Sequence, residues 1–502
     1  MRSFCIYILI AFIILPAQVF ALGANPLTLT YAGGAGQGDS YSKSFSENKW
    51  DYKYQYHVLV LSGDTPQGSL FSQIQLEERD YMTGLGYAKL SLSGSTYSID
   101  IGDNVAQFSD ITLNSLSYQG ASVTLKPSSS FQMTVLGGSR GNGSWGADVR
   151  RDTRPRETFT GVRTVFYPVG GLGLNATYLT APGGADVLAY GSEYVFRDLK
   201  FAGEYGSALE GKAFRGEIRY QTSWLTLGTI YRDVDDTYVV PFDYVGYKGM
   251  KGTYSTLGIR PWSNMNINIQ SDSYIDRLNG DPDLTVNDTR GDISYNLSPS
   301  TNIGYSGWRN DRSAYDRGGI SEGELMYITQ QFVLLTKNAI YYRYQPTWFE
   351  SLNPSEESSV EKSYSENKNI SGINIALFDT AHLNYEIENT IRLIKDTNID
   401  INTKAVTVRM DVFDTQIMSS PFYIASTFNH RRDIPDRGSN EKETITTYED
   451  ATLKFIPNKD LSCFITAKVL KITAPEEYRL TREQHDLSFG MIYSFNTSFY
   501  LK

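Results

Sequence analysis

The stretch 487–501, with the sequence LSFGMIYSFNTSFYL, alternates strictly between two kinds of side chain. Every second position from the first is apolar or aromatic apart from one threonine: Leu487, Phe489, Met491, Tyr493, Phe495, Thr497, Phe499 and Leu501. The positions between them are mostly small or polar. Successive side chains of a strand point to opposite faces, so the stretch predicts one very long strand with an apolar face. By itself it fits a soluble sheet edge as well as a membrane barrel.

An aromatic-rich strand in this place resembles the C-terminal targeting strand of Gram-negative outer-membrane β-barrels. That family usually ends on an aromatic residue, and this chain departs from the pattern by ending Tyr500-Leu501-Lys502. The resemblance implies a porin-like protein, inserted from the periplasm by the barrel-assembly machinery. It would lie among outer-membrane lipids and lipopolysaccharide.

The beginning of the chain has the features of a secretion signal. Arg2 supplies a positive charge, residues 5–16 form an apolar run, and Val19-Phe20-Ala21 is a small-residue cleavage site. We therefore expect residues 1–21 to be a signal peptide. A retained anchor is the alternative, but the run is short for a span of about 20 residues.

The composition excludes several classes of protein. Mean hydropathy is −0.34 and no long apolar run follows the signal, which excludes a helical membrane protein but not a barrel, in which only half of each strand faces lipid. Only 2 cysteines are present, so a disulfide scaffold is excluded. The net charge of −10 argues against nucleic acid as a partner.

Two-residue alternation recurs along the whole chain, as in residues 121–126, 214–220, 265–272, 381–393 and 405–412. One face carries aliphatic and aromatic residues, and the other carries full charges of both signs. A β-sandwich also alternates, but a chain this long would be divided into several domains joined by linkers. No linker or shift in composition is found. A single closed sheet with lipid outside and a wet lumen explains this uniformity better.

Short and long connections tend to alternate, as expected for periplasmic turns and external loops. Residues 346–369 and 309–319 are two of the expected long loops. The segmentation predicts an all-β fold: a large single transmembrane antiparallel up-and-down β-barrel of about 22–26 strands. The barrel would comprise residues 51–502. Residues 22–50 are either a tail or a first strand and loop.

Candidates for catalysis are few. The histidines, His57, His382, His430 and His485, are scattered, and none has a cysteine, a Ser-Gly motif or metal-ligand spacing nearby. We therefore expect no enzyme activity, no metal and no cofactor.

The charged faces of the predicted strands are the best candidates for lining a pore. In lipid, a basic side chain near the midplane would cost about 2–4 kcal/mol, so these residues must face inward. Their mixed signs indicate a hydrated lumen with weak selectivity, and inter-strand ion pairs that stiffen the wall are a compatible role. The candidates are Arg215, Glu217, Arg219, Glu386, Glu388, Arg392, Arg409 and Asp411.

A basic run lies in one of the expected external loops: Arg150, Arg151, Arg154 and Arg156. It could fold inward to attract anionic solutes or bind lipopolysaccharide phosphates. Neighbouring acidic residues partly neutralise it, so a solvated loop is the simpler interpretation.

Two further features concern the outer wall. Cys463 falls on the apolar face of its predicted strand, which favours a lipid-facing position over a reactive thiol. Aromatic residues near strand ends fit interfacial girdles; they include Trp224, Tyr231, Tyr341 and Tyr342.

Three functional hypotheses follow. The first is an outer-membrane pore for a large polar solute or a secreted polysaccharide. The second hypothesis is a sheath around a partner protein that fills the lumen, because an open bore this wide would breach the membrane barrier. Such a sheath would be similar to the porin component of porin–cytochrome electron conduits. The third, less favoured, is a barrel-mounted hydrolase.

Overall fold

A computed structural model defines the fold. It describes residues 27–43, 47–79, 82–139, 158–181, 186–240, 247–278, 284–314, 317–334, 336–351, 363–378, 381–395, 399–414, 422–435, 444–458, 460–473 and 482–499. The predicted signal peptide lies outside these residues. Across the described part, no helix has the length and apolar character needed to cross a membrane.

The described residues form one sheet of 26 strands. In chain order the strands are β1 (Leu27–Lys43), β2 (Glu47–Thr65), β3 (Gly68–Arg79), β4 (Met82–Ser93), β5 (Tyr97–Ala106), β6 (Leu116–Ser128), β7 (Phe131–Ser139), β8 (Thr158–Val169), β9 (Leu172–Thr180), β10 (Val187–Phe196), β11 (Leu199–Ser207), β12 (Lys212–Gln221), β13 (Leu225–Val234), β14 (Met250–Ile259), β15 (Met265–Asp276), β16 (Leu284–Ser298), β17 (Thr301–Ala314), β18 (Arg317–Leu334), β19 (Thr336–Ser351), β20 (Tyr364–Phe378), β21 (Ala381–Ile394), β22 (Ile399–Asp414), β23 (Phe422–Pro435), β24 (Thr444–Asn458), β25 (Leu461–Thr473) and β26 (Arg482–Phe499).

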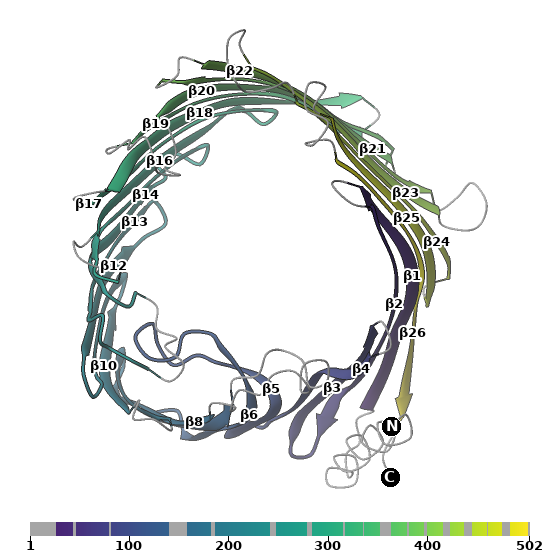
Figure 1. Cartoon of the computed structure of the whole chain (residues 1–502). Helices are drawn as coiled ribbons and strands as arrows, with labels where there is room; N and C mark the ends of the chain where they lie inside the picture. The colour runs from purple at the N-terminus through teal and green to yellow at the C-terminus, as the bar shows by residue number, and fades with distance from the viewer. Residues whose placement is uncertain are drawn as a thin grey trace.

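The sheet closes on itself (Figure 1). Each strand pairs antiparallel with its neighbours in sequence, and β1 pairs with β26 from Leu27↔Phe499 to Lys43↔Glu483. The predicted closed antiparallel barrel is therefore confirmed, with a strand number at the upper end of the predicted range. The sequence left open whether residues 22–50 form a tail or a first strand. In the structure, Leu27–Lys43 forms a strand.

The two faces of the wall differ as the alternation predicts. On β12, Phe214 and Ile218 point outward and are 42% and 54% exposed. Arg215 and Glu217 lie between these two residues in the strand. They belong to the opposite face and form an ion pair. On β26, Leu487 and Phe489 are 53% and 51% exposed on the outer face. A continuous apolar outer surface is what lipid requires of a spanning sheet.

The strands reach further into the expected long loops than the sequence suggests. Strand β19 continues to Ser351 and β20 begins at Tyr364, inside the loop expected at 346–369. Strand β17 likewise runs to Ala314, inside the loop expected at 309–319. Main-chain ladders do not depend on apolar side chains, so polar segments extend the wall beyond the apolar belt.

The strand number determines how wide the barrel is. Neighbouring strands lie about 4.8 Å apart and tilt by about 40° in such barrels, so 26 strands enclose a circle roughly 50 Å across between backbones. Side chains and the connections between strands narrow that bore.

Closure between the first and last strands is testable by cross-linking. Ala35 and Met491 lie directly opposite each other, and Cα atoms so placed are about 4.5–5.5 Å apart, within disulfide range. In a Cys463→Ser background, Ala35→Cys with Met491→Cys should form an intramolecular disulfide, detected by mass spectrometry of non-reduced peptides.

The matched control pairs Ala35→Cys with Leu487→Cys, which lies roughly 14 Å further along β26 at about 3.4 Å per residue. This pair should not cross-link. A disulfide found only in the control, or only between molecules, would contradict the register.

Candidate functional site

The segment between β5 and β6, residues 107–115, folds into the barrel. Figure 1 shows it inside the ring of strands, beside the wall formed by β6 to β13. Because it contacts one face of this wall, it identifies that face as the lumen. The sequence analysis did not single out this segment, which we call the inner segment.

The inner segment is held by an apolar cluster at one end of the lumen. Phe108, Ile111 and Leu113 are buried against wall residues at or near the strand ends that meet there. These wall residues are Leu116, Tyr118, Leu136, Phe159, Leu179, Val187, Ala213 and Val234. Complete burial of an aliphatic side chain contributes about 1.5–3 kcal/mol, so three anchors hold the segment firmly.

A second chain segment covers the first. After β13, Tyr238 and Val240 are fully buried in the same cluster. The Tyr238 hydroxyl donates a hydrogen bond of 2.9 Å to the main-chain oxygen of Ile111. Burial raises the pKa of Tyr238 well above its usual value, so the phenol keeps the proton that it donates.

One of the candidate pore-lining residues, Arg215, contacts the inner segment, and two more, Glu217 and Arg219, pair with it or beside it on β12. Arg215 pairs through Nε with Asp110 Oδ2 at 2.9 Å and through Nη2 with Glu217 Oε2 at 3.0 Å. Glu217, only 7% exposed, also lies 3.5 Å from Arg219 Nε. Lys200 joins the network through Glu217 at 4.0 Å and also pairs with Glu193 at 2.9 Å. The structure therefore brings Arg215, Glu217 and Arg219 into one ion-pair network.

Two charged groups lie deeper beneath the inner segment. The Arg163 guanidinium donates to the main-chain oxygen of Phe108. Glu204 Oε1 is buried without a hydrogen-bond partner. Burying charged groups costs free energy unless they are paired, and the hydrogen bond from Arg163 to Phe108 offsets part of that cost while the segment is docked.

The remaining candidates lie on another part of the wall, on β21 and β22. Glu386 accepts a 2.8 Å hydrogen bond from the Tyr341 hydroxyl. Glu388 pairs with Lys368 at 2.6 Å, and Arg392 pairs with Glu366 at 2.8 Å. Arg409 lies opposite Asn384 on the same face. The side chain of Asp411 lies outside the described side chains, although its register position is opposite His382.

Other predictions have different outcomes. The basic cluster Arg150, Arg151, Arg154 and Arg156 lies outside the described residues. Tyr341 was predicted for an outer girdle, and this is wrong: it is 6% exposed and shares the inner face with Glu386. Two adjacent tyrosines in a strand must face opposite ways, and Tyr342 takes the outer position, 43% exposed.

The four histidines lie on β2, β21, β23 and β26. Within the described ranges, no group of three His, Cys, Asp or Glu residues could hold a metal ion. The expectation that the chain has no enzyme activity stays a prediction.

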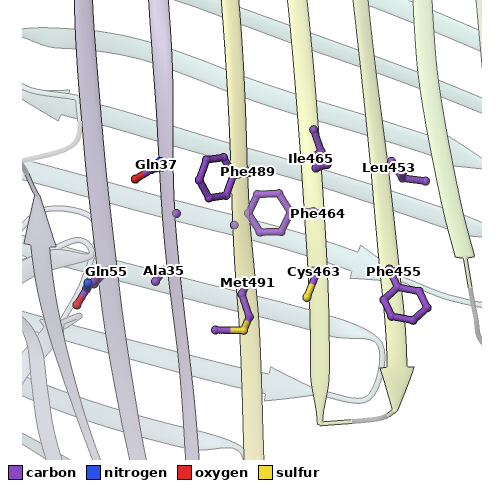
Figure 2. A pocket seen from close by; sticks show the side chains of 12 residues that line it. Ala35, Gln37, Gln55, Leu453, Phe455, Cys463, Phe464, Ile465, Phe489 and Met491 are labelled. Carbon is purple, nitrogen blue, oxygen red and sulfur yellow. The ribbon is translucent and has the colours of Figure 1, made fainter.

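The outer wall is hollowed where the barrel closes. A groove of about 580 Å³ crosses β1, β26, β25 and β24, and Figure 2 shows Phe489, Met491, Cys463 and Ile465 along it. Cys463 lies directly opposite Met491 and so belongs to the apolar outer face, where the sequence placed it.

No protein-family model matches the sequence, and no curated protein matches it either. Among solved structures, the P pilus usher (PapC) translocation pore aligns with a TM-score of 0.44 and 10% identity, over 93% of this chain and 99% of that one. An E. coli P pilus tip assembly intermediate, PapC-PapD-PapK-PapG, aligns with a TM-score of 0.49 and 10% identity, over 95% of this chain and 61% of that one. OccK11 (OpdR) of Pseudomonas aeruginosa aligns with a TM-score of 0.31 and 9% identity, over 95% of this chain and 97% of that one.

At these scores the likeness carries no functional conclusion, and the class follows from the strand pairing itself. A closed antiparallel sheet with an apolar exterior and a charged interior is the architecture of outer-membrane β-barrels.

Docking of the inner segment is testable by proteolysis. Ile111→Asp would place a charge in a fully buried apolar site, which should release the segment. Chymotrypsin should then cut reconstituted barrels after Phe108 or Leu113, whereas native barrels resist. Leu209→Asp is the control, because Leu209 is 80% exposed in a neighbouring connection. Equal resistance of both variants would contradict the anchoring.

The orientation of the wall is testable at Cys463. A nitroxide attached there in lipid vesicles should be relaxed by dissolved oxygen, which partitions into hydrocarbon, and not by a water-soluble nickel complex. The opposite pattern in power-saturation spectra would place Cys463 in the lumen. A label at Arg343→Cys, on the inner face, is the matched control.

Proposed function

We propose that the chain is an outer-membrane pore for a large polar cargo, with a secreted polysaccharide as the favoured class. The barrel-assembly machinery would insert it from the periplasm among outer-membrane lipids and lipopolysaccharide. The observation that carries this proposal is the combination of a 26-stranded closed wall with a charged inner face.

The width of the barrel supports a large cargo. A bore tens of ångströms across far exceeds what small solutes need, since barrels of 16 to 18 strands already leave an aqueous channel. The inner segment lies against one part of the wall (Figure 1). It narrows the lumen on that side.

The chemistry of the inner wall supports a hydrated cargo. The described candidate charges are largely matched by opposite partners, as in Arg392 with Glu366 and Glu388 with Lys368. Paired charges keep the wall wet without creating a strong field of one sign across it.

A second candidate function is a sheath around a partner protein. The same width favours it, because a bore of roughly 50 Å between backbones could enclose a small folded domain. Any haem would then belong to the partner chain. Charge complementarity with the paired inner wall would be weak, which favours the pore.

Conductance in planar bilayers tests the proposal. The purified barrel should conduct, and it should admit polyethylene glycols that are too large to enter narrower porins, because its bore is wider. Ile111→Asp should change the conductance by releasing the inner segment, and Leu209→Asp should leave it unchanged.

A silent barrel would overturn the open pore. A protein that co-purifies with that silent barrel in mild detergent would support the sheath instead, and a visible haem spectrum would identify its class.

A further inference from the structure

Three aromatic rings on the inner wall lie flat across glycines of neighbouring strands. A Cβ atom on Gly323 would overlap the Trp308 ring, and one on Gly304 would overlap the Tyr327 ring. On Gly319 it would lie 2.7 Å from the Phe349 ring. Each ring therefore lies directly over a glycine of the wall, and each side chain stays partly exposed.

The register places all three rings on the inner face. Trp308 pairs with Gly323, and Gly323 pairs with Thr347. Tyr327 pairs with Arg343. Thr347, Arg343 and Phe349 alternate along β19 with Tyr342 and Trp348, which are exposed on the outer face. The rings thus face the lumen on the part of the wall away from the inner segment.

An arginine lies beside two of these rings. Arg290 is directly opposite Trp308, and Arg343 is directly opposite Tyr327. Arg290 is 61% exposed and lies 3.2 Å from Asp292. The Arg343 guanidinium lies 4.8 Å from the centre of the Tyr341 ring, and among the described residues no carboxylate pairs with it. A ring over a glycine and an exposed guanidinium therefore lie side by side twice, as two units. The Arg290 guanidinium donates to the Asp292 carboxylate from both Nε and Nη2, so Arg343 is the one of the two whose donors no described carboxylate occupies.

The two units follow one another along the wall. The first unit lies over Gly323 of β18, and the second contains Tyr327 of the same strand. The two positions are roughly 14 Å apart at about 3.4 Å per residue. Phe349 continues the series and contacts Tyr364, with ring centres 5.7 Å apart. The Arg392 guanidinium in turn lies 4.4 Å from the Tyr364 ring. The series runs along the wall, as a path for an extended chain must.

We propose that this series, Trp308, Arg290, Tyr327, Arg343 and Phe349, is a binding track for an acidic polysaccharide. The C–H face of a sugar ring carries partial positive charge and stacks on the negative face of an aromatic ring. The guanidinium fork matches a sugar carboxylate and binds it in two hydrogen bonds. The inference rests on the proposed function and specifies its cargo.

Calorimetry with the intact barrel tests the track. The probe is an oligogalacturonate of seven units, and neutral maltoheptaose is the comparison. The detergent must have no sugar headgroup, since that would compete. The acidic probe should bind more tightly than the neutral one, and added salt should weaken its binding. Equal binding of the two probes, or none of the acidic one, overturns the proposal.

Variants show whether the aromatic rings bind the probe or only pack over the glycines. Trp308→Leu and Arg343→Gln should each weaken binding of the acidic probe about tenfold. Gly323→Ala keeps the ring but displaces it, and should weaken binding as well. Trp348→Leu, on the outer face of the same part of the wall, should bind like the native barrel. Heat-modifiable migration on gels verifies folding of each variant.

Two outcomes stay distinguishable. If Trp308→Leu and Arg343→Gln bind as well as the native barrel, the rings only cover glycines and the track is wrong, although a conducting barrel would still support the pore. If the native barrel neither conducts nor takes up the probe, the proposed function fails too.

Discussion

The main-chain hydrogen bonding between β1 and β26 is the constraint on which the rest of the structure depends. Hydrocarbon offers no partner to an unpaired N–H or C=O group, each of which would cost several kcal/mol. An open sheet of this length would expose two full edges. The pairing from Leu27↔Phe499 to Lys43↔Glu483 removes both edges at once. Closure also separates the two faces of every strand into a lipid side and a water side.

That separation explains why side chains of opposite character alternate without conflict. Phe214 and Ile218 face lipid, while Arg215 and Glu217 on the same strand face water and pair with each other. The exception is the rim occupied by the inner segment, where the inner face is apolar. There Phe159, Leu179 and Val187 are covered by Ile111 and Leu113. One part of the lumen thus contains a small hydrophobic core like that of a soluble protein.

The inner wall has two unlike regions as a result. Between β6 and β13, apolar anchors and the Arg215–Glu217 network hold the inner segment. Around β17 to β20, aromatic rings lie over glycines and are partly exposed. The first region is occupied by the chain itself, and the second is the proposed contact with a cargo. This asymmetry supports a lumen in which a polymer runs along one part of the wall.

The sequence by itself determined the all-β class, the closed barrel and the two faces, because alternation with period two is a local property of each strand. It also placed Cys463 on the apolar outer face, where the register has it opposite Met491. The pore-lining role of Arg215 and Glu386 stays a prediction. The sequence could not reveal the inner segment, since Phe108, Ile111 and Leu113 show no periodicity and their partners lie on distant strands. The sequence also could not decide which of the adjacent residues Tyr341 and Tyr342 faces outward. The outward assignment of Tyr341 was wrong because only one of two neighbouring residues in a strand can take the outer position. Only the tertiary structure decided which ring lies over which glycine, because that depends on the register between neighbouring strands.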